Sequence, residues 1–170
     1  IYRIGVRDKA MLELLYACGL RVSELVNLKL SQIMMESSFL RVIGKGSKER
    51  IIPINDYAIS FLKKYVDEYR SDFAINKKTD SLFLTNRGKE MTRQSFWNII
   101  KKYATKVGIH EHLSPHTLRH AFATHMINNG ADLRVVQILL GHNDLATTQL
   151  YTHIAKNELK EIHCKNHPRA

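Results

Sequence analysis

Residues 39–54, FLRVIGKGSKERIIPI, interrupt a chain whose other patterned segments have helical periodicity. Two runs rich in β-branched residues flank the glycine-containing turn GKGSK, and this pattern is typical of a β-hairpin. The segment 81–85, SLFLT, is expected to add a third strand to the same sheet. Because most of the other patterned segments have helical periodicity, we expect a mainly α fold with a small antiparallel β-sheet (α+β).

Apolar residues recur at helical spacing through the remaining segments. The helices expected from this spacing cover 8–18, 21–28, 56–70, 92–104, 114–129, 133–140 and a final segment around 157–162. Gly19, Gly130 and Gly141 follow three of these segments and are expected to end them. Asp132 is expected to cap the helix that follows it.

The chain has 170 residues, of which 44% are hydrophobic and 25% charged, without an internal repeat or a convincing linker. These values indicate one globular domain with a proper core. No apolar run is long enough to span a bilayer, and the N-terminus lacks a signal-peptide pattern. Cys18 and Cys164 offer no disulfide framework, which favours a reducing cytoplasm. Because the chain starts with Ile1, a preceding domain is expected to be missing.

The charge of the chain points to a polyanionic partner. Lys and Arg total 26 and Asp and Glu total 16, which gives a formal net charge of +10. Such an excess favours nucleic acid as the partner, with an anionic membrane surface as the lesser alternative.

The stretch LSPHTLRHAF, residues 113–122, concentrates cations where a helix is expected to begin. Ser114 and Pro115 suit an N-cap and a first helical residue, so His116 and Arg119 would share one face of the first turn. A helix N-terminus already carries partial positive charge and free N–H donors. Adding an imidazole and a guanidinium there is unfavourable unless an anion binds opposite them.

Three other stretches place a cation or a hydrogen-bonding group at a turn or a helix start. They are CGLRVSEL with Arg21, GKGSKER with Lys45, and LGHNDLATTQLYTH with His142 and Tyr151. Each has an ordinary structural explanation when taken singly: a surface or ion-paired arginine, a solvated lysine, a helix C-cap and a packing tyrosine. The four stretches acquire a common meaning only when they are considered together.

A metal site is the main chemical alternative. His116 and His120 have the i, i+4 spacing of zinc ligands, but Arg119 lies between them and would repel a dication. His163, Cys164 and His167 could chelate a metal, although an unstructured tail is the simpler expectation. The sequence also lacks a glycine-rich nucleotide loop of the usual spacing. We therefore expect neither a metal nor another cofactor.

Together the four stretches resemble the catalytic domain of the tyrosine recombinase (lambda integrase-like) family across nearly the whole chain. Six positions match the residue types of the family in order: Arg21, Lys45, His116, Arg119, His142 and Tyr151. Glu24, in RVSEL, matches an acidic position of the family. The residues of the stretches CGLRVSEL, GKGSKERIIP and LGHNDLATTQLYTH, with the ending HPRA, are most similar to the bacterial Xer group.

The resemblance implies that the anion is the scissile phosphate of DNA. Two arginines suit a phosphodiester in its pentacoordinate transition state, because they bind its oxygens with paired hydrogen bonds and keep their protons. The resemblance makes Tyr151 the nucleophile, His116 the better candidate to accept its proton, and His142 a further hydrogen-bonding group. Lys45 is expected to be the general acid, Glu24 to orient its neighbours, and His120 to be structural.

The resemblance also implies partners and a setting. The expected substrate is double-stranded DNA at a specific site, bound by a tetramer of four subunits that includes a related recombinase, in chromosome-dimer resolution. Residues 1–170 would be the catalytic domain, the missing preceding domain would bind DNA, and the segment 155–170 would dock on a neighbouring subunit. The alternatives are a mobile-element integrase, DNA relaxation like that of a type IB topoisomerase, a non-catalytic DNA-binding module, and an RNA- or membrane-binding basic protein.

Overall fold

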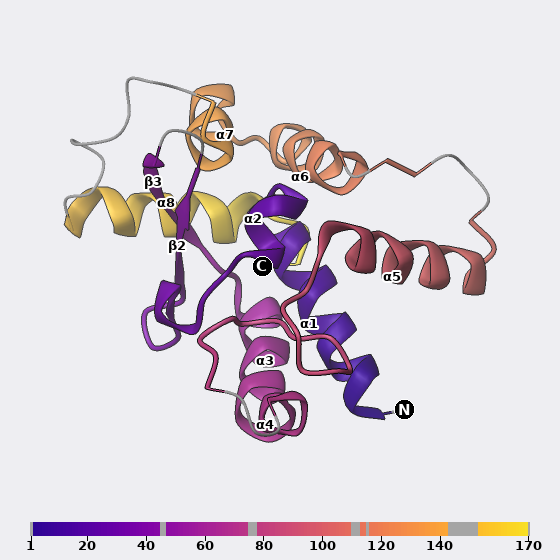
Figure 1. The fold of residues 1–170 in the computed structure, drawn as a ribbon. Coiled ribbons are helices and arrows are strands. Elements are labelled where there is room, and N and C mark those ends of the chain that lie inside the picture. Colours follow the sequence, from indigo (N-terminus) through magenta and orange to yellow (C-terminus); the bar gives the residue numbers. More distant parts are fainter. Residues whose placement is uncertain are drawn as a thin grey trace.

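A computed structural model describes residues 2–44, 47–74, 78–109, 113–114, 116–142 and 153–169, of which 153–155 are described in the backbone alone. Within these residues the chain is mostly helical, with a three-stranded antiparallel sheet on one side (Figure 1). The expected fold class is confirmed. None of the helices in the described part of the chain combines the length and the apolarity that crossing a bilayer requires.

Helix α1, Tyr2–Cys18, begins six residues earlier than the expected segment 8–18 and runs through the middle of the molecule (Figure 1). The spacing of its apolar residues predicts an amphipathic helix with one buried face. The helix instead buries residues around most of its circumference. The buried charges among them are paired: Arg7 donates from Nε and Nη2 to Asp8 Oδ1, at 3.0 and 2.6 Å. Gly19 ends the helix with a φ of +57°, a conformation that favours glycine.

The sheet is built on the expected hairpin. Its strands are β1 (Ile33–Met34), β2 (Phe39–Ile43) and β3 (Glu49–Pro53), in the order β1-β2-β3. In the β2–β3 ladder Phe39 pairs with Pro53 and Ile43 with Glu49. The last pair lies next to the connection predicted from GKGSK. One face of the hairpin is buried and the other is largely exposed, which gives the alternation seen in the sequence.

The expected third strand at 81–85 is wrong, because β1 occupies that place beside β2. Ser81 forms a single bridge with Lys29, and Leu84 forms another with Glu90. The consecutive side chains of Leu82–Leu84 are all fully buried, whereas a strand with one exposed face would bury alternate residues. The β-branched and aromatic content of SLFLT therefore reflects burial rather than a ladder.

The remaining helices follow the expected order. They are α2 (Val22–Val26), α3 (Asp56–Lys64), α4 (Arg70–Phe73), α5 (Arg93–Lys106), α6 (Thr117–Asn128), α7 (Leu133–Leu140) and α8 (His153–Asn166). The expected single helix 56–70 is divided, because one turn of π-helix, Tyr65–Tyr69, separates α3 from α4. Helix α6 begins at Thr117, later than Ser114, because Thr117 Oγ1 accepts the Ser114 N–H at 2.8 Å and forms a separate turn.

Helix α8 packs on its own chain, against α6 and β3, and passes beside the sheet in Figure 1. Leu159 is 6% exposed and belongs to the hydrophobic core, while His163 is fully buried and its Nε2 lies 2.7 Å from Ala17 O. The expectation of an unstructured tail around His163–His167 is therefore wrong. In this structure the segment packs within its own chain, and its docking on a neighbouring subunit stays a prediction.

Candidate active site

Arg21 lies at the start of α2, where Glu24 holds both its backbone and its side chain. Glu24 Oε2 accepts the Arg21 N–H at 2.8 Å, and Glu24 Oε1 accepts from Arg21 Nη1 at 3.0 Å. The first of these bonds satisfies an amide at the helix N-terminus in the manner of a capping box. Glu24 is buried, whereas the Arg21 side chain is 39% exposed. Glu24 therefore contacts both the backbone and the side chain of Arg21, and its orienting role in a reaction stays a prediction.

A second arginine, which the sequence argument missed, binds the same carboxylate from the hairpin. Arg50 Nη1 donates to Glu24 Oε1 at 2.8 Å, and Arg50 Nη2 donates to Glu24 Oε2 at 2.9 Å. Arg50 Nε donates to Leu139 O, near the end of α7, at 2.9 Å. Glu24 is thereby shared between two guanidinium groups, and Arg50 joins α2, β3 and α7.

The sequence did contain a signal for Arg50. Side chains alternate between the two faces of a strand, and Ile52 faces the core. Arg50, two positions before it, must face the core as well, and it is only 8% exposed. A buried arginine requires a partner, so its position in the hairpin register could have drawn attention to it.

Arg119 is much more enclosed than Arg21. It is 7% exposed, and its Nη1 donates to Gly19 O and its Nη2 to Leu140 O, each at 2.6 Å. These two acceptors lie just after α1 and at the last residue of α7, where helix carbonyls lack partners within the helix and carry partial negative charge. Two helix C-termini therefore bind the guanidinium of Arg119.

Glycines terminate both of these helices beside the site. Gly19 has a φ of +57° and Gly141 a φ of +71°. A Cβ atom at Gly19 would lie 2.5 Å from the Phe122 ring, and one at Gly141 would lie 3.1 Å from Arg50 Cδ. The helix ends can therefore approach α6 and the hairpin only because these two positions carry no side chain.

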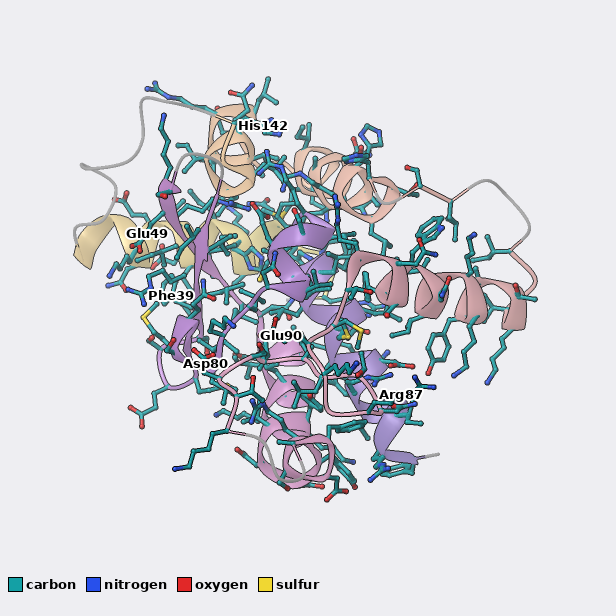
Figure 2. All side chains as sticks on the ribbon, in the orientation of Figure 1. Phe39, Glu49, Asp80, Arg87, Glu90 and His142 are labelled. Atoms are coloured by element: carbon teal, nitrogen blue, oxygen red, sulfur yellow. The ribbon has the colours of Figure 1, made fainter. Side chains whose placement is uncertain are left out.

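His142 follows Gly141 just after the end of α7, and Figure 2 labels it beside that helix. Its Nε2 lies 3.2 Å from Arg119 Nη2. Because a guanidinium only donates, Nε2 accepts in this arrangement and the neutral ring carries its proton on Nδ1. Burial lowers the pKa of His142, and the positive charges of Arg119, Arg21 and Arg50 lower it further. The ring is therefore neutral at pH 7.

The charged groups of the site influence one another's pKa values. Burial lowers the pKa of Arg119 to about 10, and the charges of Arg21 and Arg50 act in the same direction. Arg119 remains protonated at neutral pH. Burial raises the pKa of Glu24, but the hydrogen bonds and charges of Arg50 and Arg21 outweigh it and hold that pKa below its usual value. The cluster at neutral pH therefore comprises three cations around one carboxylate, an excess of positive charge that favours an anion.

His116 lies exposed just before α6 and borders a hollow of about 610 Å³ that it shares with Arg21. The first turns of α5 line the same hollow with Arg93, Gln94 and Trp97. A second hollow of about 610 Å³ borders Arg21 and reaches Gly44 at the end of β2. Among the predicted site residues that the structure describes, Arg21 is thus the one that lines both hollows.

Two of the six predicted positions, Lys45 and Tyr151, lie outside the described residues. Gly44 precedes Lys45 and is hydrogen-bonded through its amide to Lys48 O at 2.7 Å. The roles of Lys45 and Tyr151 stay predictions. The structure brings together Arg21, Glu24, Arg119 and His142, and it gives His116 a shared hollow with Arg21.

The histidines with the spacing of metal ligands have other surroundings. His163 and His167 stack on each other, with ring centroids 5.0 Å apart, and both are buried inside the domain. His120 is exposed and lies 3.5 Å from Thr124 Oγ1. No cluster of three or more histidine, cysteine or acidic residues that could hold a metal ion occurs among the residues described.

Residues 2–158 match the sequence profile of the phage integrase family. The chain belongs to the phage integrase family. This assignment confirms the resemblance to the tyrosine recombinases, and the matched range includes all six predicted positions.

Within the phage integrase family the similarities concentrate in the Xer group, as expected. The tyrosine recombinase XerD of Pseudomonas putida is 57% identical over 98% of this chain and 56% of its own length. The crystal structure of XerA recombinase superposes with a TM-score of 0.73 at 34% identity, covering 97% of this chain and 58% of that one. The XerH site-specific recombinase bound to its difH substrate, in a pre-cleavage complex, gives a TM-score of 0.73 at 27% identity, over 93% of this chain and 46% of that one. The chain spans about half the length of the curated relatives it matches.

Proposed function

We propose that this chain is the catalytic domain of a site-specific DNA recombinase that cuts and rejoins strands through a 3′-phosphotyrosine link. The observation that carries the proposal is the cluster of three arginines near one buried carboxylate: Arg21 and Arg50 bind Glu24, and Arg119 interacts electrostatically with all three. Arg21 is 39% exposed and lines a hollow that it shares with His116. Buried ion pairs that serve stability alone have no need for such an excess of cations. The names of the relatives, tyrosine recombinase XerD, support the same activity.

The reaction follows from these groups. The phenolate oxygen of Tyr151 attacks the scissile phosphorus, a P–O bond to tyrosine forms, and the bond to the 5′-oxygen breaks. Negative charge that gathers on the non-bridging oxygens is stabilised by Arg21 and Arg119, since preorganised cations stabilise charge that develops in a transition state. The phosphotyrosine retains the bond energy, so a 5′-hydroxyl of another strand can reverse the step without ATP.

Two proton transfers accompany each cleavage. A free tyrosine has a pKa of about 10, so Tyr151 needs a base, and His116 is proposed to accept its proton. The departing 5′-oxygen needs an acid, and Lys45 is proposed to supply the proton. His142, neutral at pH 7, is proposed to donate a hydrogen bond to the phosphate from Nδ1 while its Nε2 accepts from Arg119.

The surface around the hollow suits a DNA backbone. Arg93 and Gln94 begin α5 beside Arg21 and His116, and together they offer several hydrogen-bond donors to phosphate oxygens. The net charge of +10 adds long-range attraction for a polyanion. XerH was solved on its difH substrate, which supports a duplex at a specific site as the substrate here.

The likeness to XerD supports a role in chromosome-dimer resolution, in the cytoplasm, within a tetramer that includes a related recombinase. In this proposal a DNA-binding domain precedes residue 1 in the full protein, because the relatives are about twice as long as this chain. Integrase from mycobacterium phage Brujita is also similar, at 28% identity and a TM-score of 0.72, so mobile-element integration is the second candidate.

Helix α8 is proposed to leave its seat on β3 and α6 during assembly and to dock on a neighbouring subunit. Truncation after Ala155 should then reduce cooperative assembly on a two-site DNA more than it reduces binding of one subunit to a half-site. Equal losses of both would make α8 an internal element alone, which is its arrangement in this chain.

Trapping on a nicked suicide substrate tests the proposal. Wild-type protein carrying its preceding domain should form a covalent protein–DNA adduct on a Xer-type site, and Tyr151→Phe should bind the same DNA without forming an adduct. The trapped strand ends map the cleavage position. Binding without an adduct in the wild type would make the protein a DNA-binding module and overturn the proposal.

A recombination assay separates the remaining rivals. Supercoil relaxation without strand exchange between two sites would indicate a topoisomerase, and exchange between a mobile element and a chromosomal target would indicate an integrase. Exchange between two copies of one chromosomal site is the result expected here.

A further inference from the structure

We propose that Arg50 is a positioning residue that holds the hairpin bearing Lys45 and the helix end bearing His142 in register with the Glu24–Arg21 pair. The inference rests on the proposed function, since it assigns Arg50 a part in the same reaction. Arg50 itself is buried and donates its hydrogen bonds to other protein groups, so it acts through its neighbours.

The contacts of Arg50 join three elements through one rigid group. Within the described part of the chain, three of its five N–H bonds are used, two on the carboxylate of Glu24 and one on Leu139 O. The bidentate pair with Glu24 fixes both the distance and the plane of the two groups. Because Glu24 also holds the backbone and side chain of Arg21, a shift of Arg50 would move the arginine that faces the hollow.

Two glycines border the guanidinium, and each directly precedes a proposed site residue. A Cβ atom at Gly44, the residue before Lys45, would lie 3.8 Å from Arg50 Nη1. A Cβ atom at Gly141, the residue before His142, would lie 3.3 Å from the same nitrogen. Arg50 is therefore in close reach of the backbone at the start of both segments, and its position limits where each segment can begin.

Arginine suits this place better than lysine. A lysine ammonium is a single charged point, which cannot bind both oxygens of Glu24 in a plane and reach Leu139 O at the same time. Lysine would nevertheless keep the positive charge that the buried Glu24 requires. The change Arg50→Lys therefore removes the geometry while it retains the charge balance.

The first test measures single-turnover cleavage on the suicide substrate at saturating protein. Arg50→Lys should slow cleavage about 100-fold, the scale expected when catalytic groups are misplaced by about 1 Å, while DNA affinity stays within about threefold. Arg41→Lys, an exposed arginine on the neighbouring strand β2, is the matched control and should cleave like the wild type.

Double-mutant cycles distinguish positioning from a general loss of stability. If Arg50 acts through Lys45 and His142, Arg50→Lys should cost at least about tenfold less in the Lys45→Ala or His142→Ala background than in the wild type, because the placed group is already gone. Equal costs in all three backgrounds would overturn the proposal.

A second readout does not depend on any reaction. The amides of Gly44, Gly141 and His142 donate to Lys48 O, Ile138 O and Gln137 O at 2.7, 3.0 and 3.0 Å. Arg50→Lys should speed hydrogen exchange at these three amides by about tenfold and leave α3 and α5 unchanged. A uniform increase along the whole chain would assign Arg50 to global stability and overturn the proposal, even if wild-type protein formed no DNA adduct and the proposed function failed.

Discussion

Arg21 and Arg119 differ in how much of their hydrogen-bonding capacity the protein itself uses. Contacts within the described residues use three of the five N–H bonds of Arg119, on Gly19 O, Leu140 O and His142 Nε2. The Arg21 side chain donates only to Glu24 among them and is more than a third exposed. Arg119 is thus built into the protein, whereas Arg21 has more donors left for a phosphate.

This difference makes Arg21→Ala the cleaner test of transition-state stabilisation. Cleavage should fall by about 100- to 1,000-fold, as when one donor to a developing oxyanion is removed, while DNA affinity falls only a few-fold. Single-turnover cleavage and fluorescence anisotropy measure the two quantities. Arg93→Ala, which lines the same hollow from α5, should instead weaken binding and leave the saturated cleavage rate near that of the wild type. Parallel losses of binding and cleavage in Arg21→Ala would make Arg21 an ordinary phosphate contact.

The general acid can be identified by changing the leaving group. A 5′-bridging phosphorothiolate releases a thiolate, which departs without a proton, whereas the normal 5′-oxygen needs one. Lys45→Ala should therefore be badly impaired on normal DNA and largely restored by the sulfur substrate. A lysine has an ordinary pKa of about 10.4, which nearby cations and desolvation would lower toward the working range. If sulfur gives no rescue, another group delivers the proton.

At this scale the sequence was informative where the chemistry depends on residue type and order. Arg21, Glu24, Arg119 and His142 do meet, although they come from three separate places in the chain. Arg50 was missed because an arginine in a polar turn sequence is usually solvated. Its inward position follows only once the hairpin register is known.

The elements around the site are arranged by where helices stop. Helices α1 and α7 end at glycines with positive φ, and carbonyls at these ends bind Arg119 and Arg50. A helix that continued past either glycine would use those carbonyls internally and withdraw them from the arginines. The stop signals therefore define the cation sites as well as the helix lengths.

Gly141→Ala tests this relation between a helix end and the site. The substitution should lower the free energy of unfolding by about 1 kcal/mol for the positive φ, and by more because the new Cβ meets Arg50 Cδ at 3.1 Å. Gly108→Ala is the matched control, since Gly108 has a φ of +74° and open space where its Cβ would lie. Chemical denaturation and suicide-substrate cleavage should show the larger stability loss, and a loss of cleavage, in Gly141→Ala only. Equal effects of both substitutions on stability and cleavage would contradict the proposed dependence of the site on the end of α7.

A helix or strand was predictable from the sequence where the spacing of apolar residues, a capping residue and a terminating glycine indicated the same element. The hairpin and the boundaries of α7 followed from β-branched runs, from Asp132, which accepts the Arg134 N–H, and from Gly141. The prediction of a strand at 81–85 was wrong because burial on all sides and pairing in a sheet favour the same residue types. The start of α6 failed because the Ser114 turn competes with the helix for the same hydrogen-bonding groups.

At the scale of the whole molecule, two buried histidines, His163 in α8 and His167 just after it, hold this helix against the rest of the domain. His167 Nδ1 accepts from the Arg169 N–H at 3.1 Å and lies 3.1 Å from Asn55 Nδ2. Burial lowers the pKa of His167 to about 4, and the neighbouring His163 acts in the same direction. The folded chain thus favours neutral rings, while the unfolded chain takes up protons below an ordinary histidine pKa of about 6.5.

Stability should therefore decline as the pH falls from about 6.5 toward about 4, the window between the two pKa values of His167. The unfolded state binds more protons in this window, so acid lowers the free energy of unfolding, by about 3 kcal/mol at its lower limit. Thermal melts between pH 7 and pH 4.5 measure the decline. His167→Asn, which keeps an acceptor in place of Nδ1, should flatten it, and His120→Asn on the surface should not. An unchanged slope in His167→Asn would assign the decline to other groups.

The contacts that complete the site join distant parts of the chain. Arg119 and Gly19 are 100 residues apart in the sequence, and Arg50 and Leu139 are 89 apart. During biosynthesis, α1 and the hairpin emerge long before the helices that complete these bonds. Under the proposed function, a nascent or partly unfolded chain would have no competent cleavage centre. The protein would then be unable to nick the genome until folding was finished, and local melting of α7 would silence it before the rest of the domain unfolded.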